Sequence, residues 1–178
     1  MIRHRLCRAQ YSLATMLLVV TALCVWLSVQ VNRAHRQRAA VAAIKNLGGL
    51  VGYDESALPI WLQQLGGDAF VHVVDVNFYK CPVTDQDLAC LVGLPYVRYL
   101  TLGDTAIGDG AIQQFVRLPL RKLYLSDTKL TDTGAKQLEN LRDLELVELF
   151  RTDVTEAGII KLRLALPACE IGWWKSGG

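Results

Sequence analysis

The residues with the clearest chemical potential are two Asp-Thr pairs, Asp104-Thr105 and Asp127-Thr128. Two carboxylates held near each other can divide the roles of acid and base in catalysis. These pairs, however, stand 23 positions apart within stretches of similar sequence. Recurrence at a fixed step is typical of a backbone turn that is used repeatedly, and Asp and Thr are common turn residues. We therefore interpret the pairs as turns rather than as catalysts.

The sequence indicates no other catalytic or metal-binding set. The five cysteines form no C-x-x-C pair and have no histidine at ligand spacing, and the three histidines are far apart at positions 4, 35 and 72. Three cysteines lie in the globular part, an odd number that excludes a complete disulfide framework. No serine stands in a nucleophile-elbow context. We expect free thiols, no catalytic residue, no metal, no cofactor and no small-molecule substrate.

The Asp-Thr pairs belong to a segment that occurs four times, at about residues 71–94, 95–118, 119–141 and 142–165. Alternating apolar residues open each copy and predict a short strand with one buried face; they are Val76/Phe78, Leu100/Leu102, Leu123/Leu125 and Val147/Leu149. A small residue follows, which we expect to turn inward and satisfy backbone groups in the bend; it is Cys81, Thr105, Thr128 or Thr152.

The second half of each copy predicts a helix. Thr84, Thr131 and Thr155 stand at expected N-caps with an acidic residue directly after them, whereas Gly108 takes this place in the second copy and weakens the cap. Apolar residues then recur three apart, which marks one helical face; they are Leu88/Leu91, Ile112/Phe115, Ala135/Leu138 and Ile159/Leu162. Stacked copies would bury these faces between a parallel sheet and a row of helices.

The ends of such a stack need caps, because the outermost units would otherwise expose apolar edges. We assign residues 49–70 to an N-terminal cap with a possible strand from Leu50 to Tyr53 and one or two helical turns near 59–65. Its expected buried side chains are Trp61, Leu62, Leu65 and Phe70. Residues 166–178 form the C-terminal cap and tail, which starts a further strand and is sealed by Ile171, Trp173 and Trp174.

The region before the repeats differs sharply in charge. Residues 1–47 contain seven Lys or Arg and no acid, while the remainder contains 12 basic and 17 acidic residues. The 24 residues between Arg8 and Arg33 carry no charge, and as a helix they would cover about 36 Å, more than the roughly 30 Å hydrocarbon core of a bilayer. We predict a basic tail over 1–10, a transmembrane helix over 11–31 and a juxtamembrane helix over 32–48 that stops at Gly48-Gly49.

Two features of this region stay open. A cleaved signal peptide is the alternative to an anchor, although the apolar core is longer than a signal core and a small-residue cleavage site is missing. Three arginines stand on each side of the apolar segment, so the positive-inside rule does not decide its orientation. The basic residues that follow the span suit either anionic head groups or solvent.

The pattern L-x-x-L-x-L-x-x-T/C-x-I/V-T-D/E-x-G resembles the cysteine-containing leucine-rich repeats that occur in F-box adaptor proteins and in many bacterial proteins. The chain is also similar to bacterial membrane-anchored leucine-rich-repeat proteins in its Tyr-Ser-Leu-x-Thr-Met-Leu-Leu opening, its Val-Asn-Arg-Ala-x-Arg-Gln-Arg segment and its Gly-Gly turn. The resemblance implies an α/β fold: a short solenoid of about four strand-helix repeats after an N-terminal transmembrane helix. An apolar span rather than an F-box precedes the repeats, which argues against a ubiquitin-ligase role.

A repeat of this kind offers a concave strand face for binding. By register, its three rows are Asp75, Tyr99, Lys122, Leu146; Asn77, Thr101, Tyr124, Glu148; and Tyr79, Gly103, Ser126, Phe150. Aromatic residues in these rows resemble interface anchors, although strands favour aromatics in any case. The predicted partner-binding residues are Tyr79, Tyr99, Thr101, Lys122, Tyr124, Glu148 and Phe150. Basic residues do not dominate the face, so we expect no nucleic acid.

Three function classes follow. The leading hypothesis is a single-pass membrane protein whose non-enzymatic repeat domain binds a protein or peptide. The second is a soluble or secreted leucine-rich-repeat adaptor of the F-box-like, substrate-recruiting type, from which the N-terminal segment has been removed. The third is an enzyme subunit or hydrolase, which the missing catalytic set disfavours.

Overall fold

The computed structural model describes residues 13–54 and 72–174, and the chain divides into two compact units, residues 1–33 and 34–178. Helix α1 (Leu13–Asn46) contributes to both. It is long and apolar enough to cross a membrane, with a mean hydropathy of 1.8 in its most apolar window and none of that window buried. Large apolar side chains such as Leu18 and Val19 are two-thirds exposed, 67% each. The predicted tail over 1–10 lies outside the described residues.

The C-terminal end of α1 matches the predicted stop. The amide of Gly48 donates to the carbonyl of Lys45 (3.0 Å) and that of Gly49 to the carbonyl of Ile44 (2.9 Å), which satisfies carbonyls that a helix end leaves free. Gly48 has φ +83°, a left-handed conformation that favours glycine. The double glycine therefore ends the helix and turns the chain into the first strand.

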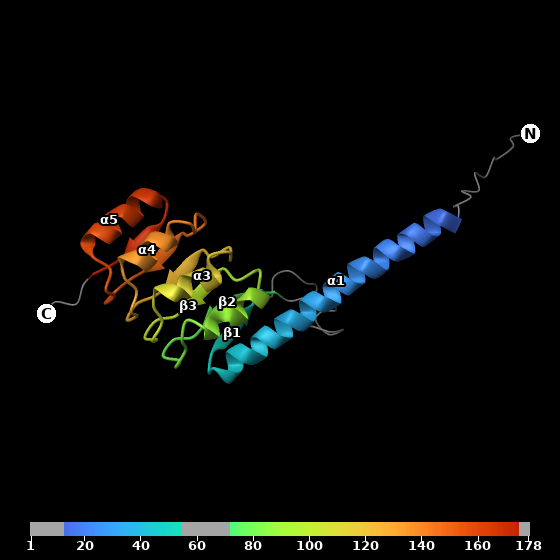
Figure 1. Ribbon diagram of the computed structural model, residues 1–178, viewed down its shortest axis with the longest axis horizontal. Coiled ribbons are helices and arrows are strands. Elements are labelled where there is room, and N and C mark those ends of the chain that lie inside the picture. Colours follow the sequence, from blue (N-terminus) through green and yellow to red (C-terminus); the bar gives the residue numbers. More distant parts are fainter. Residues whose placement is uncertain (1–12, 55–71, 175–178) are drawn as a thin grey trace, which may run out of the picture. The chain divides into compact units, whose positions relative to one another are not determined.

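The second unit is built on a six-stranded sheet in chain order (Figure 1). Its strands are β1 (Leu50–Tyr53), β2 (Val73–Asn77), β3 (Tyr99–Thr101), β4 (Lys122–Tyr124), β5 (Leu146–Glu148) and β6 (Glu170–Gly172). Strand β1 pairs with β2 antiparallel, and all later pairs are parallel. The strands expected near residues 50–53 and after 166 are both present. The helical turns expected over 59–65, and the side chains of Trp61, Leu62, Leu65 and Phe70, lie outside the described residues.

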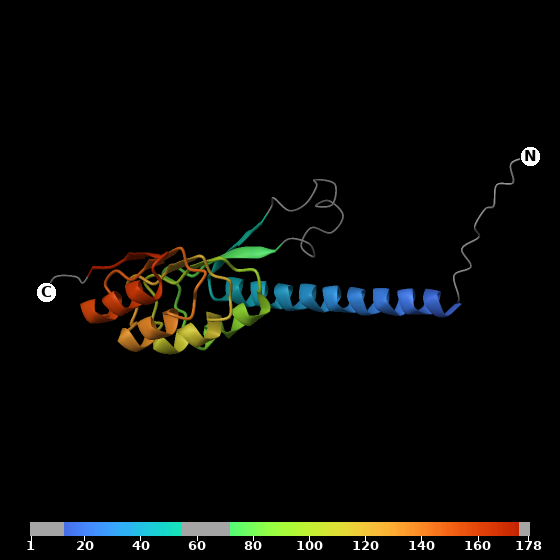
Figure 2. The same cartoon turned by 90° about the horizontal axis from the view of Figure 1, so that it is seen from above.

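Helical segments follow the strands: η3 (Asp87–Gly93) and η4 (Asp109–Ala111), which are 3-10 helices, and α3 (Ile112–Phe115), α4 (Asp132–Leu138) and α5 (Glu156–Ala165). Figure 2 shows α3, α4 and α5, coloured yellow to red, along one side of the sheet. The predicted apolar pairs at three-residue spacing are all buried beneath these segments. One buried residue from each parallel strand, all in one register row, closes the core from the sheet side, and these are Val76, Leu100, Leu123, Val147 and Ile171.

The end of α1 also enters this core. Ile44 is 0% exposed and Ala40 6%, and both belong to the same apolar cluster as the strand and helix residues. Gly93 allows this approach, because a Cβ there would lie 3.1 Å from the Cβ of Ala40 and from the carbonyl oxygen of Arg36. The sequence pattern placed this stretch in a juxtamembrane helix and did not indicate its contribution to the core.

The bend after each strand has a recurring conformation. Lys80, Asp104, Asp127 and Arg151 have φ of 59°, 57°, 59° and 54°, the left-handed region. The next residue then turns inward as predicted: Oγ1 of Thr105, Thr128 and Thr152 donates to a carbonyl three residues earlier at 2.6, 2.7 and 2.9 Å. Cys81 differs, since its half-exposed thiol lies 3.8 Å from the Tyr79 carbonyl. The Asp-Thr pairs are thus parts of turns.

Two predicted N-caps are confirmed and one is wrong. Thr131 Oγ1 accepts from the amide of Thr133, and Thr155 Oγ1 accepts from the amide of Gly158 (both 3.2 Å). Thr84 does not cap a helix. Its amide and hydroxyl donate to the carboxylate of Asp87 at 2.8 and 2.7 Å. This closes a turn ahead of the helix, so η3 begins only at Asp87, as a 3-10 rather than an α-helix.

Aspartate carboxylates link each strand-helix segment to the next one along the sheet. Asp109 accepts from the amide and hydroxyl of Thr131 (2.8 and 2.6 Å), and Asp132 accepts from the same groups of Thr155 (2.7 Å each). Asp85 accepts from the amide of Gly108 (2.8 Å). The hydrogen bonds from Thr155 hold the pKa of Asp132 below its usual value. We call these three bonded aspartates the aspartate ladder.

Candidate partner-binding face

The predicted rows lie side by side as the step of the repeat requires. Each holds its four predicted residues, one from each of β2 to β5, and the structure adds a fifth from β6: Asp75, Tyr99, Lys122, Leu146 and Glu170, then Asn77, Thr101, Tyr124, Glu148 and Gly172. Their side chains alternate with the buried middle row, so they point away from the core. We call these two rows, together with Tyr79, Gly103, Ser126 and Phe150 beyond the strand ends, the open face.

The third row continues the pairing past the strands. The amides of Lys80, Asp104 and Asp127 donate to the carbonyls of Gly103, Ser126 and Phe150 at 3.1, 2.9 and 2.9 Å. Backbone hydrogen bonds therefore join neighbouring repeated segments beyond the ends of the regular strands. This extends the open face from two rows to three, as the register predicted.

A shallow hollow of about 270 Å³ lies on this face, lined by Tyr79, Thr101, Gly103, Tyr124, Ser126 and Glu148. Four of the seven predicted binding residues are among its walls. Gly103 makes room for the hollow, because the ring of Tyr79 and the carbonyl oxygen of Ser126 lie 3.3 and 3.4 Å from where a Cβ would stand. Tyrosine rings, hydroxyls and one carboxylate therefore converge on a single depression.

One polar atom in this wall has no protein partner. The Ser126 hydroxyl oxygen is shielded from solvent and makes no hydrogen bond in the structure. A buried hydroxyl without a partner costs roughly 1–3 kcal/mol. The Glu148 side chain, for its part, takes part in no ion pair within residues 13–54 and 72–174. The hollow thus offers one carboxylate that pairs with no described residue, whereas the Ser126 hydroxyl is closed off within the wall.

The other three predicted residues flank the hollow. The ammonium of Lys122 lies 5.8 Å from the ring centroid of Tyr99, within the range of a cation–π contact. Phe150 packs against Trp174 with ring centroids 4.2 Å apart. Its ring also covers Gly172, where a Cβ would lie 2.7 Å from Cζ of Phe150. Phe150 therefore joins the C-terminal cap, where Trp174 is 54% exposed.

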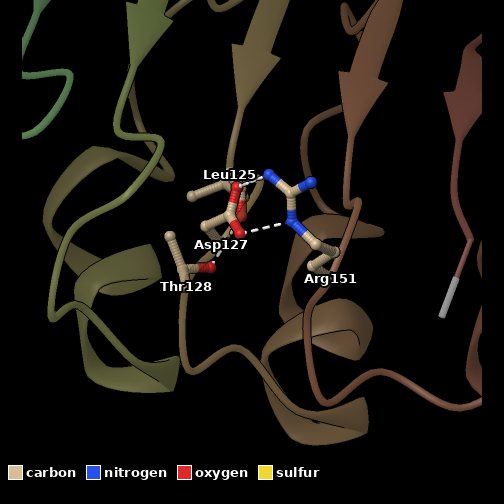
Figure 3. Close-up of polar contacts among 4 residues, drawn as sticks. All are labelled: Leu125, Asp127, Thr128 and Arg151. Atoms are coloured by element: carbon tan, nitrogen blue, oxygen red, sulfur yellow. Dashed lines mark hydrogen bonds and ion pairs between the residues drawn. The ribbon is translucent and has the colours of Figure 1, made fainter. Parts of the chain in front are cut away.

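An ion pair borders the face at the turns. Arg151 donates through Nε and one terminal nitrogen to both oxygens of Asp127 (Figure 3). These hydrogen bonds lower the pKa of the Asp127 carboxyl and raise the pKa of the Arg151 guanidinium. Figure 3 also shows Thr128 directed at the Leu125 carbonyl just behind this pair. The sequence pattern predicted that Asp127 lies in a turn but did not indicate Arg151 as its partner. Arg151 lies in the equivalent turn after the next strand, β5.

Lys80 and Asp75 are two further charged residues at this face. The ammonium of Lys80 lies 5.1 Å from the ring centroid of Tyr79. Burial raises the pKa of the Asp75 carboxyl, since this side chain lies against Gly52 of β1. Three cations of this face and its bordering turns, Lys80, Lys122 and Arg151, each contact a partner other than Glu148.

Within the described ranges, no group of three or more His, Cys, Asp or Glu could hold a metal ion. Cys24, Cys81, Cys90 and Cys169 are free thiols, and burial raises the pKa of Cys90 and of Cys169. A higher thiol pKa leaves less of the reactive thiolate.

Comparison with known proteins adds little. No family model matches the chain, and no curated protein matches it. Among solved structures, it is similar to "Leiomodin-1 Actin-Binding Site 2 (ABS2)", with 13% sequence identity and a TM-score of 0.46 over 58% of this chain and 72% of that chain.

Proposed function

We propose that this chain is a leucine-rich-repeat protein of the bacterial membrane-anchored type, and that its open face binds a protein or peptide partner while α1 holds it at a membrane. The observation that carries the binding role is the hollow, where two tyrosines and a carboxylate that pairs with no described residue meet on one exposed surface. Exposed aromatic residues around a depression are typical of the anchor positions of protein interfaces.

The repeat supports the fold assignment. Four parallel strand pairs stand in register at steps of 23 or 24 residues, with a helical segment after each of β2 to β5. The left-handed bend and the aspartate ladder recur at the same step. In a stacked repeat each unit contacts mainly its neighbours, and such proteins commonly bind on the strand side.

The anchor is supported by composition and length. The apolar part of α1 exposes large aliphatic side chains along its own surface. A membrane would remove that apolar surface from water at about 25 cal/mol per Å². Tethering would also raise the local concentration of a small binding face, which favours weak partners through clustering.

The first test is a cross-linking pull-down from membranes with the wild type and the double variant Tyr99→Ala/Tyr124→Ala. We expect the double variant to lose roughly tenfold or more in partner yield, because truncated aromatic anchors commonly cost 2 kcal/mol or more. Tyr96→Ala is the matched control. Tyr96 is 40% exposed but lies off the open face, against His72. Equal recovery of the same partners by the wild type and the double variant would refute the proposal.

A further inference from the structure

We infer that the hollow of the open face receives a cationic side chain, lysine or arginine, of the bound protein. The inference rests on the proposed function and narrows the partner to one that presents a basic residue. Its starting point is the charge of the hollow. Glu148 is the single ionisable carboxylate among the six lining residues, and no lining residue is basic.

The carboxylate is available. Glu148 is half-exposed, and its side chain makes no hydrogen bond or ion pair with any residue that the structure describes. The basic groups around it are committed elsewhere: Arg151 to Asp127, Lys122 to the ring of Tyr99, and Lys80 to the ring of Tyr79. An incoming cation would therefore meet an unpaired negative charge.

The remaining walls suit the rest of such a side chain. Tyr124, the neighbour of Glu148 across the β4–β5 pair, and Tyr79 supply aromatic surface. Aromatic rings attract cations and also pack against the methylene stem of lysine or arginine.

An acidic or a purely apolar side chain fits less well. An acid would face Glu148 at close range, and like charges repel. An aliphatic side chain would strip water from the Glu148 carboxylate without replacing it by a partner, which costs free energy. A cation instead pairs with the Glu148 carboxylate and lies against the tyrosine rings.

The test uses the full chain in detergent micelles with nitrogen-15 labelling. It is titrated with the blocked pentapeptide Gly-Gly-Arg-Gly-Gly and with its citrulline counterpart, which has the same shape without the charge. We expect saturable shifts of the Ser126 and Glu148 amide signals with the arginine peptide, and with a lysine peptide, but not with citrulline. Glu148→Gln should weaken binding about fivefold, the range of a single exposed ion pair.

Glu170→Gln is the matched control. It removes the same charge from the neighbouring strand of the same face but lies outside the hollow. A second variant, Tyr124→Leu, keeps the apolar bulk and should weaken binding through loss of the aromatic ring. Unchanged affinity in both Glu148→Gln and Tyr124→Leu would overturn the inference, as would equal binding of the citrulline peptide.

Two further outcomes would also overturn it. One is tighter binding of a Gly-Gly-Glu-Gly-Gly peptide. The other is the same signal shifts on raising the protein concentration without peptide, which would assign the hollow to a second copy of the chain. If the peptides fail while partner capture still depends on Tyr99 and Tyr124, this inference falls and the proposed function stands.

Discussion

Thr128 shows how much one hydroxyl can contribute to this fold. It is 6% exposed, and its hydroxyl donates to the Leu125 carbonyl at 2.7 Å, inside the bend that follows β4. The preceding residue, Asp127, is held in a left-handed conformation with φ 59°. Non-glycine residues adopt this conformation at a cost of about 1–2 kcal/mol. The internal hydrogen bond helps to offset that cost.

We expect Thr128→Val to lower the free energy of unfolding by about 1–2 kcal/mol, because it leaves a buried carbonyl without its partner. The measurement is guanidinium unfolding of the full chain in micelles, followed by near-ultraviolet circular dichroism. Thr101→Val is the control, since Thr101 is half-exposed on β3 and its hydroxyl bonds to none of the described residues; it should change stability by less than about 0.5 kcal/mol. Equal effects of the two substitutions would contradict this role.

At the scale of elements, the aspartate ladder explains the Thr-Asp-x-Gly pattern. Asp132 follows the N-cap of α4, and its carboxylate reaches the N-cap of α5. Gly158 of α5 leaves the space that this carboxylate occupies, since a Cβ there would meet Oδ1 of Asp132. Gly134 makes the same allowance for Asp109. These glycines are required by crowding, because neither has a positive φ.

Gly158→Ala should therefore destabilise the protein by about 1–3 kcal/mol through overpacking, although alanine within a helix is normally better than glycine by roughly 0.5–1 kcal/mol. The expected loss is measured by unfolding as above.

A double-mutant cycle supplies the control. In the background of Asp132→Ala, the carboxylate is gone and the added methyl group has room, so Gly158→Ala should cost less than half as much. The same penalty in both backgrounds would show that the aspartate is not the cause, and would point instead to Val154, whose Cγ1 lies 3.2 Å from the same position.

The whole molecule depends on α1 in two ways. Its apolar part is the candidate membrane span, and its C-terminal part brings Ile44 and Ala40 into the core of the second unit. Strand β1 then covers the first edge of the parallel sheet in antiparallel fashion. This covering reduces the exposed strand edge, which is otherwise a site for unwanted pairing.

We expect the mature protein to retain residues 11–31 and to stay in the membrane fraction after alkaline carbonate extraction, because an uncharged helix of that length is strongly held by lipid. Mass spectrometry of the purified protein defines its first residue. A mature start beyond residue 30, with the protein released into the soluble fraction, would overturn the anchor and favour the secreted adaptor.

Local pattern was enough to predict much of this molecule. Alternation and the step of 23 or 24 residues determined which strand residues are buried and which neighbours share a row, because side-chain direction in a strand repeats every two residues. That is why Tyr99 and Lys122, or Thr101, Tyr124 and Glu148, are correctly aligned. The helix end at Gly48 and the caps at Thr131 and Thr155 are also local, since their bonds join residues close in sequence.

Only the tertiary structure decided which side chains meet between neighbouring strand-helix segments. The pairing of Asp132 with Thr155, and of Asp127 with Arg151, depends on how closely stacked units approach. The entry of Ile44 into the core depends likewise on where α1 packs. The sequence by itself determined on which side of a strand or helix each side chain lies, because that follows from backbone geometry within one element. It did not determine which groups meet across the stack, because that follows from distances between elements far apart in the chain.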